Sequence, residues 1–539
     1  MLSELPAELL LSIASYLDDR TYTLRLASSC RAIYLLLLPT VFASLDLTDY
    51  ESGNLNRLVQ TLACKPELAQ EVRTLSVSHW RSIPRVRYRG YDQETILPVL
   101  KSVLGPDESL STWKYRLQGY DYASCDAWTA LLLSLLPNLQ DLTLNEISTT
   151  RTLKWMARVA QEDSSALSRL RNLTVVCCPP RRGGGLRSSH FLPILRLPSL
   201  RSFCGYLISD DDTHDDASVD ASVDASVDAS DDTSDDVSDD MSDDASDDMS
   251  DDMFDDMFDD SSDDASDDTY DDGRDEDNAF VSTSYLPDNI GYSNVTEIRL
   301  ISCYSLRGFT ELVEAPKRLE SFIFESDSGN KLNTRGPGMY PSRYFPPLSR
   351  HWEALHTLTL TDAGRHDSLR DYEYFGSLAG FSALKNLRLP TCHILDWDHV
   401  SDLGPGWSES NLRKTSKIGF ADVLPPSLET LVLDGLEREH TTGITKALKD
   451  LLLGGKYHCP NLMYLEIKGE RSHVQESTLE VFASPRSIAP MLQEFAEFKS
   501  GVEILCSAAG VDFCFRDVFV EEIAKMDRIF GYYRSQGTL

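Results

Sequence analysis

The sequence predicts an α/β solenoid, a fold in which strand-and-helix units stack on one another along the chain. Three observations lead to this prediction. A short apolar pattern recurs along most of the 539 residues, and helical stretches lie between most of its copies. The first 45 residues, by contrast, have the spacing of three short helices.

The recurring pattern is L-x-x-L-x-L, with conservative apolar substitutes, and it is typical of leucine-rich repeats. Such units cannot bury their apolar side chains alone, so stacked neighbours share one core and their strands line a concave wall. Spacings that mostly lie between 24 and 44 residues predict irregular repeats with long convex loops. Clear copies begin at Leu139, Leu170, Val295, Leu319, Leu355, Leu384, Leu428 and Leu462, and degenerate copies at Val72 and Leu200. Helices are expected at Trp128–Leu136, Thr152–Gln161, Phe191–Leu195, Phe309–Glu314 and Thr445–Leu453.

One spacing is anomalous, because Leu200 and Val295 are 95 residues apart. The segment Asp210–Asp277 between them contains 32 Asp, one Glu and one Arg, a net charge of -32. Without its 68 residues the spacing is an ordinary 27, so we interpret the tract as an insertion within a single repeat. Blocks of like charge are usually disordered. Four interpretations of the tract remain open: a solvated loop without a specific role, a segment that attracts basic partners, a kinase substrate, or a weak binder of divalent cations.

Composition argues against several functions. The rest of the chain is near neutral, at about -3 of the total -35, and has no basic cluster, which argues against nucleic-acid binding. Its apolar runs are too short to span a membrane, and its start does not resemble a signal peptide. Eleven cysteines are therefore expected as reduced thiols in the cytoplasm or nucleus. Catalytic and phosphate-binding fingerprints are missing, so we expect no enzyme and no cofactor.

The cysteines and histidines suggest structural roles rather than a metal site. No paired C-x-x-C set exists, although Cys392, His393 and His399 lie close together in the sequence. Cys178, Cys303 and Cys392 each fall three residues after the last apolar residue of a strand pattern. Leucine-rich repeats place Asn or Cys there to cap backbone groups in the turn. The glycine run at 183–185 lacks the spacing of a phosphate cradle and is expected to be a loop.

Three short helices are expected before the repeats. The second covers Thr23–Ser28, and the third runs from Arg31 to Leu38 and ends before Pro39. So small a core usually needs a partner surface. The apolar face of the first helix consists of Leu5, Leu9, Leu10, Ile13, Ala14 and Leu17.

These residues also resemble a known motif. The run Leu5-Pro6-x-Glu8-Leu9-Leu10-x-x-Ile13-x-x-Tyr16-Leu17, then Leu24-Arg25-Leu26-Ala27-x-x-Cys30-Arg31, then Leu38-Pro39-x-x-Phe42-x-x-Leu45-x-Leu47, is similar to the F-box. The alternative is an unrelated three-helix packing motif. The chain resembles fungal F-box proteins that carry leucine-rich repeats. The resemblance implies a non-catalytic substrate-recognition subunit of a Skp–cullin–F-box ubiquitin ligase. The adaptor contacts that it implies are Leu5, Pro6, Leu9, Ile13, Leu17 and Leu26.

The expected domains are an F-box at 1–47, repeats at 48–209 and 278–539, and the insertion at 210–277. The second repeat segment ends in a capping helix at 518–532. The resemblance implies that the repeats bind an unknown target protein, and the strand residues between the apolar positions should face solvent. Candidate target contacts are Thr143, Arg299, Thr359, Arg388 and Glu466, among neighbours that include Tyr464 and Lys468. The alternative for these residues is an ordinary solvated sheet face. The alternatives to the ligase function are a non-degradative interaction scaffold and a chaperone that binds basic proteins through the acidic tract.

Overall fold

The computed structural model divides into two units, one of residues 1–212 with 280–539 and one of residues 213–279. All the residues that it describes belong to the first unit. The acidic tract, the glycine run, Cys178, His399 and the expected capping helix at 518–532 lie outside the described residues. The described residues are 5–17, 20–48, 53–78, 92–105, 108–118, 122–147, 151–162, 165–177, 186–209, 290–303, 305, 309–326, 341–362, 374–397, 416, 418–437, 440–453, 458–469 and 485–517.

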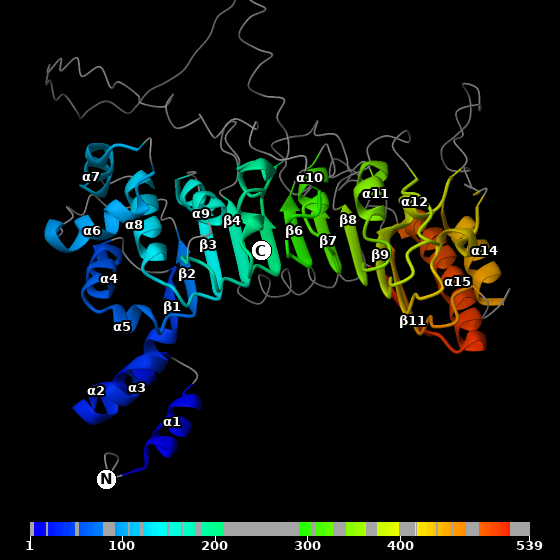
Figure 1. Ribbon diagram of the computed structural model, residues 1–539. Helices are drawn as coiled ribbons and strands as arrows, with labels where there is room; N and C mark the ends of the chain where they lie inside the picture. Colours follow the sequence, from blue (N-terminus) through cyan, green and yellow to red (C-terminus); the bar gives the residue numbers. More distant parts are fainter. Residues whose placement is uncertain are drawn as a thin grey trace, which may run out of the picture. The chain divides into compact units, whose positions relative to one another are not determined.

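The described strands form one twelve-stranded sheet in which each strand pairs in parallel with its neighbours in the chain (Figure 1). Ten strands begin two residues after the first apolar position of a predicted repeat, as β3 does after Leu139 and β9 after Leu384. The repeats are therefore confirmed, including the degenerate copies at Val72 and Leu200. The strands are β1 (Ser44–Leu47), β2 (Thr74–Ser78), β3 (Asp141–Ile147), β4 (Asn172–Cys177), β5 (Ser202–Tyr206), β6 (Glu297–Cys303), β7 (Ser321–Ser326), β8 (Thr357–Asp362), β9 (Asn386–Pro390), β10 (Thr430–Leu436), β11 (Tyr464–Gly469) and β12 (Asp512–Asp517).

A repeated hydrogen-bond pattern joins the strands where they begin. The carbonyl oxygen of Arg73 accepts from the N–H groups of Gln140 and Asp141, at 2.7 and 3.0 Å. The same double acceptance joins β5 to β6, where Arg201 O accepts from Thr296 and the residue after it. A carbonyl oxygen has two lone pairs, so one acceptor satisfies both N–H groups. The sheet is continuous from β5 to β6, even though the two strands are far apart in sequence.

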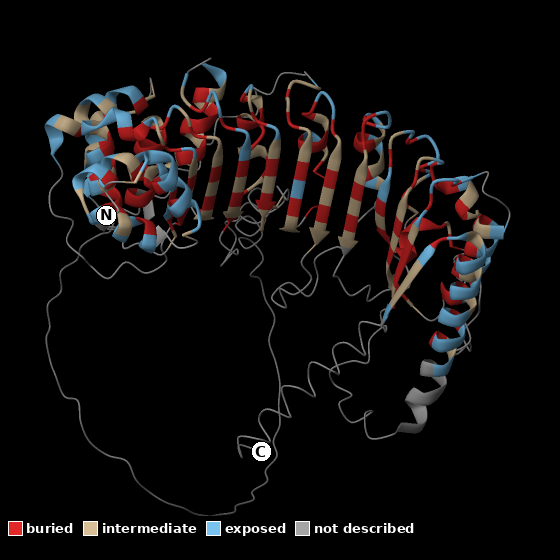
Figure 2. Ribbon diagram, turned by 90° about the horizontal axis from the view of Figure 1, so that it is seen from below, coloured by how far each residue is buried: buried red, intermediate tan, exposed pale blue. Residues whose placement is uncertain are grey.

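The helices lie along one side of the sheet (Figure 1), and the leucines of the strand pattern meet them in one apolar core. Figure 2 shows the resulting alternation of buried and half-buried residues along the strands. In β3, for example, Leu142 and Leu144 are buried and Thr143 is half-buried. The helices that follow β1 are α4 (Gly53–Cys64), α5 (Pro66–Ala69), α6 (Gln93–Val103), α7 (Leu110–Gln118), α8 (Tyr122–Ser134), α9 (Arg151–Gln161), α10 (Thr310–Glu314), α11 (Pro341–Ser349), α12 (Thr391–Ile394), α13 (Phe420–Val423), α14 (Thr441–Leu453) and α15 (Pro485–Ala509).

The N-terminal helices are α1 (Ala7–Ser15), α2 (Arg20–Ser28) and α3 (Arg31–Ala43). The expected end of the third helix before Pro39 is wrong, because α3 continues for four residues beyond it. Leu37 and Val41, one turn apart, are both buried on either side of the proline, and this packing outweighs the cost of the missing N–H. The chain then enters β1 directly, and Leu45 and Leu47 join the core of the sheet rather than that of the helices.

The helix expected at Phe191–Leu195 is also wrong. Two 3₁₀ turns occupy this region instead, η2 (Ser188–His190) and η3 (Ile194–Arg196). Pro193 lies between them and cannot donate the backbone hydrogen bond that a continuous α-helix would need there.

The turn after the strand pattern also repeats. Glu146, Leu207, Ser302 and Gly435 occupy the same place in their repeats and have φ values of 54°, 58°, 53° and 65°. This left-handed residue directs the next side chain into the core, and in β6 that side chain is Cys303. Its sulfur accepts from the N–H of Ile208 and donates to a carbonyl oxygen of β5, both at 3.4 Å. Cys303 thus has the capping role that its spacing predicts.

Candidate protein-interaction surfaces

The open face of the sheet, meaning the strand side chains that alternate with the core positions, is the first candidate surface. Strand pairing aligns the second open-face residue of each strand from β3 to β12 in what we call the central row. The row consists of Thr143, Thr174, Cys204, Arg299, Ile323, Thr359, Arg388, Val432, Glu466 and Cys514. All five residues predicted to contact a target belong to this row.

The central row spreads the predicted residues over nine strands. Neighbouring strands lie about 4.8 Å apart, so Thr143 on β3 and Glu466 on β11 are roughly 38 Å from one another. Thr359 and Arg388 are direct neighbours across β8 and β9, and only Val432 lies between Arg388 and Glu466. A surface of this length is suited to contact with a macromolecule rather than with a small molecule.

An ion-pair network crosses the last four strands of the open face. Asp434 on β10 pairs with Arg388 on β9 and with Lys468 on β11, whose Nζ lies 3.2 Å from Oδ1. Glu466 pairs with the same lysine at 3.9 Å and with Arg516 on β12 at 3.1 Å. The network therefore links four strands through alternating charges.

Glu466 lies on the predicted face. The expectation that its side chain is exposed to solvent is wrong, because Glu466 is buried. Only 8% of its surface is accessible, because charged neighbours from β11 and β12 cover it. The hydroxyl of Tyr464 donates to Oε2 of Glu466 at 3.0 Å. Desolvation, with this hydrogen bond as the next cause, raises the pKa of Tyr464 to about 12. The phenol therefore remains a donor to the carboxylate at neutral pH.

Two members of the network, Asp434 and Arg516, were not predicted from the sequence. Asp434 lies two residues after Val432, so the alternation along β10 would have placed it on the same face. Arg516 had no assigned register because β12 departs from the repeat pattern. Gly510, with φ of +71°, stands where the first leucine of the pattern would be.

The middle of the open face is more apolar. Val176, Tyr206 and Ile301 are neighbours across β4, β5 and β6 and are all half-buried. Arg299, beside this group, is an exposed side chain that pairs with Glu297 at 3.8 Å. The open face thus presents an apolar middle and a strongly ionic end, both of which are features of protein-binding surfaces.

The second candidate surface is on α1, whose apolar residues form two stripes. Leu10 and Ala14 point into a small core with residues of α2 and α3, and both are at most 5% exposed. Leu9, Ile13 and Tyr16 form an outer stripe in which 51%, 38% and 81% of each residue is exposed. The sequence predicts a single apolar face on this helix. In the structure that face is divided into residues buried in the small core and residues exposed in the outer stripe.

The other residues that the F-box resemblance implicates surround this stripe. Pro6 is exposed and precedes the first residue of α1, and Leu17 is half-buried beyond its end. Leu5 and Leu26 are half-buried against the small core. The neighbouring helices also leave large apolar side chains exposed, at Leu24 on α2 and Leu35 on α3.

Neither a metal site nor a membrane-spanning helix occurs in the described ranges. No group of three or more His, Cys, Asp and Glu side chains in them is arranged to hold a metal ion. None of their helices combines the length and the apolar character needed to cross a membrane.

Comparison with known families agrees with the repeat geometry. The family model of the leucine-rich repeat domain matches residues 278–506. This segment is a leucine-rich repeat domain. It includes β6–β11 and the ion-pair network up to Lys468, but the match does not extend to the N-terminal helices. No curated protein matches the chain. Leucine-rich repeat domains bind other proteins, so the match indicates that this segment takes part in protein–protein interaction.

Proposed function

We propose that this protein recruits targets to a Skp–cullin–F-box ubiquitin ligase in the cytoplasm or nucleus. In this proposal α1–α3 bind a Skp-type adaptor, and the open face of the repeats holds the target. The observation that supports it most is the outer stripe of Leu9, Ile13 and Tyr16, which the small helical core leaves uncovered.

The stripe has a clear energetic reason to bind a partner. Among the described residues, five buried apolar side chains make up the core of α1–α3, and this core is separate from the core of the sheet. Full burial of an aliphatic side chain contributes about 1.5–3 kcal/mol, and half of Leu9 is still available for burial. An apolar stripe beside a core of this size is typical of a docking surface.

The proposed activity needs no catalytic residue in this chain. A ligase subunit of this kind acts by proximity, because it holds the target close to a ubiquitin-conjugating enzyme. The continuity of α3 with β1 supports the proposal, since no linker separates the adaptor-binding helices from the sheet.

A pull-down with purified adaptor and cullin tests the proposal. We expect Leu9→Asp combined with Ile13→Ala to weaken adaptor capture at least 100-fold, which corresponds to about 2.8 kcal/mol. Tyr115→Ala is the matched control, because Tyr115 is a 78% exposed aromatic residue on α7, away from the stripe. Circular dichroism of each variant verifies that the chain is folded.

Three outcomes separate the possible functions. Loss of adaptor and cullin in the stripe variant alone supports the ligase. Capture of the adaptor without cullin would replace it with a non-degradative scaffold, which the leucine-rich repeat domain supports equally well. A folded stripe variant that still captures the adaptor at wild-type levels would refute the role of α1–α3.

A further inference from the structure

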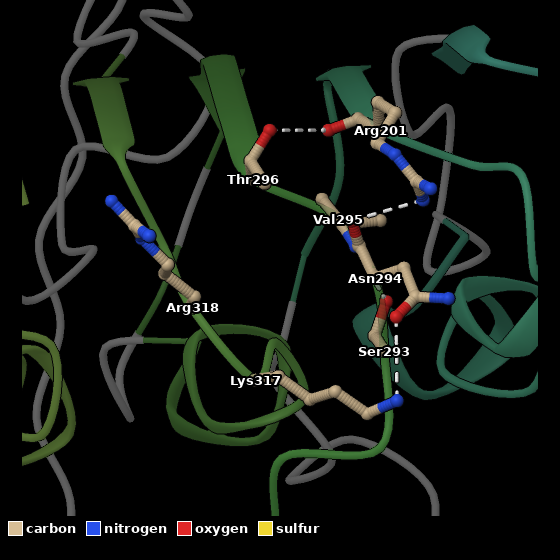
Figure 3. A pocket seen from close by; sticks show the side chains of 7 residues that line it. All are labelled: Arg201, Ser293, Asn294, Val295, Thr296, Lys317 and Arg318. Atoms are coloured by element: carbon tan, nitrogen blue, oxygen red, sulfur yellow. Dashed lines mark hydrogen bonds between the residues drawn. The ribbon is translucent and has the colours of Figure 1, made fainter. Parts of the chain in front are cut away.

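A positively charged cleft lies where the strands β5, β6 and β7 begin (Figure 3). Its volume is about 160 Å³. Three basic side chains line it, Arg201 from the residue before β5 and Lys317 and Arg318 from the turn before β7. These three residues span 118 positions of the sequence, so they form no basic cluster in the sequence itself.

Two of the three cations have no carboxylate partner among the described residues. Arg318 pairs with Glu320 at 3.3 Å. Arg201 instead donates from Nη1 to the carbonyl oxygens of Pro198, Leu200 and Asn294, at 3.1, 3.0 and 3.3 Å. Lys317 donates from Nζ to the side-chain oxygen of Asn294 at 3.3 Å. The cleft therefore has two positive charges that no described side chain neutralises.

Asn294 brings these two cations together. Its backbone oxygen accepts from Arg201 and its side-chain oxygen accepts from Lys317, while its own amide donates to Pro198 O at 3.0 Å. Figure 3 shows Arg201 and Lys317 on opposite sides of this residue. The guanidinium and the ammonium are thus held in position before any ligand arrives, which reduces the entropy cost of binding.

A further cation adds to the same field. Arg171 occupies the equivalent position one repeat earlier, and its carbonyl oxygen accepts from Arg201 N–H at 2.8 Å. Its side chain is exposed. Positive charge from neighbouring repeats thus accumulates at this edge, and it raises the local concentration of anions.

We propose that the cleft binds a phosphate dianion. A dianion matches the two unneutralised charges, and its oxygens can accept from a guanidinium and an ammonium at once. The two sources of this chemistry are a phosphorylated side chain of a partner protein and free inorganic phosphate. The site is separate from the adaptor-binding helices and does not depend on the proposed ligase function.

Titration calorimetry of the full chain at constant ionic strength tests the proposal, with sodium phosphate and a phosphoserine peptide as the two probes. We expect saturable binding of at least one probe, and no binding of the unphosphorylated peptide. Lys317→Met should weaken it about fivefold, as expected for an ion pair of an exposed lysine. Asn294→Asp should weaken it at least as much, because a carboxylate beside Lys317 would neutralise that cation and leave Arg201 alone.

Lys446→Met is the matched control, since Lys446 is an exposed lysine on α14. It should leave binding unchanged, and the thermal unfolding of all variants should match that of the wild type. Tighter binding of the phosphopeptide identifies a partner's side chain as the source, and tighter binding of inorganic phosphate identifies the free ion. The proposal is overturned if neither probe saturates, if Lys317→Met binds like the wild type, or if Lys446→Met weakens binding equally.

Discussion

The carboxylate of Asp126 on α8 accepts a hydrogen bond from the backbone N–H of Thr152, in the first turn of α9, at 3.0 Å. Its other oxygen accepts from the N–H of Arg151, also at 3.0 Å. Asp126 is fully buried. A buried carboxylate is therefore stabilised by the first-turn N–H groups of a helix in the next repeat, and the two repeats are joined by this cap.

Replacing this carboxylate should destabilise the solenoid. Asp126→Asn keeps the size of the side chain but replaces one acceptor oxygen with an amide donor that faces a backbone N–H, and we expect a loss of about 1–3 kcal/mol. Urea unfolding followed by circular dichroism measures the change. Asp450→Asn, at an exposed position of α14, should change the stability by less than about 0.5 kcal/mol. Equal effects at the two positions would show that the cap contributes nothing.

His351 predicts a pH dependence of stability. Its Nδ1 accepts from Leu319 N–H at 3.3 Å and its Nε2 lies 2.9 Å from Val313 O, so the buried ring is neutral with its proton on Nε2. Burial lowers the pKa of His351. The hydrogen bond to Val313 acts in the opposite direction, and Arg350 and Glu314 are smaller influences that oppose one another. The unfolded chain takes up this proton near pH 6.5 and the native chain only below that. Stability should therefore fall as the pH drops below about 6.5.

The measurement is the urea midpoint at pH 7.5 and at pH 5.5, for the wild type and for His351→Gln. Glutamine supplies one donor and one acceptor but does not titrate in this range. The wild type should lose more stability than the variant between the two pH values. The same loss in both proteins would exclude His351 as the source of the pH dependence.

The ion-pair network should show coupling between Glu466 and Arg516. Glu466 is buried and the Arg516 side chain is 53% exposed, so solvent weakens their attraction. We expect a coupling energy of about 0.5–1 kcal/mol from a double-mutant cycle of Glu466→Gln and Arg516→Gln. In the control cycle Arg299→Gln replaces Arg516→Gln. Arg299 lies five strands from Glu466, so the stability changes of Arg299→Gln and Glu466→Gln should be additive. A zero value in the first cycle would argue against the pairing.

Removing residues 210–277 should leave the solenoid folded. The register between β5 and β6 is regular from Ser202 with Glu297 to Tyr206 with Ile301, so the two strands pair directly with one another. We expect the thermal midpoint of the deletion variant to stay within a few degrees of the wild type. Loss of a cooperative transition would mean that this segment is part of the folded core.

Strand positions were predictable because the apolar pattern and the strand start are tied by local geometry. Leu384 and β9 illustrate this, since the pattern alone fixes both the buried Leu387 and the open-face Arg388. The burial of Glu466 was not predictable, because Arg516 covers it from a strand whose repeat begins with Gly510. Long-range packing also decides the continuation of α3 beyond Pro39.

The direct passage from α3 into β1 makes the N-terminal helices sensitive to helical phase. Each residue of an α-helix turns the chain by about 100° and advances it by about 1.5 Å. One residue inserted after Pro39 would therefore rotate the outer stripe of α1 by about 100° relative to the sheet, and four inserted residues would bring it back to within about 40°. The direction in which a molecule bound to Leu9 faces is thus determined by the number of residues in α3.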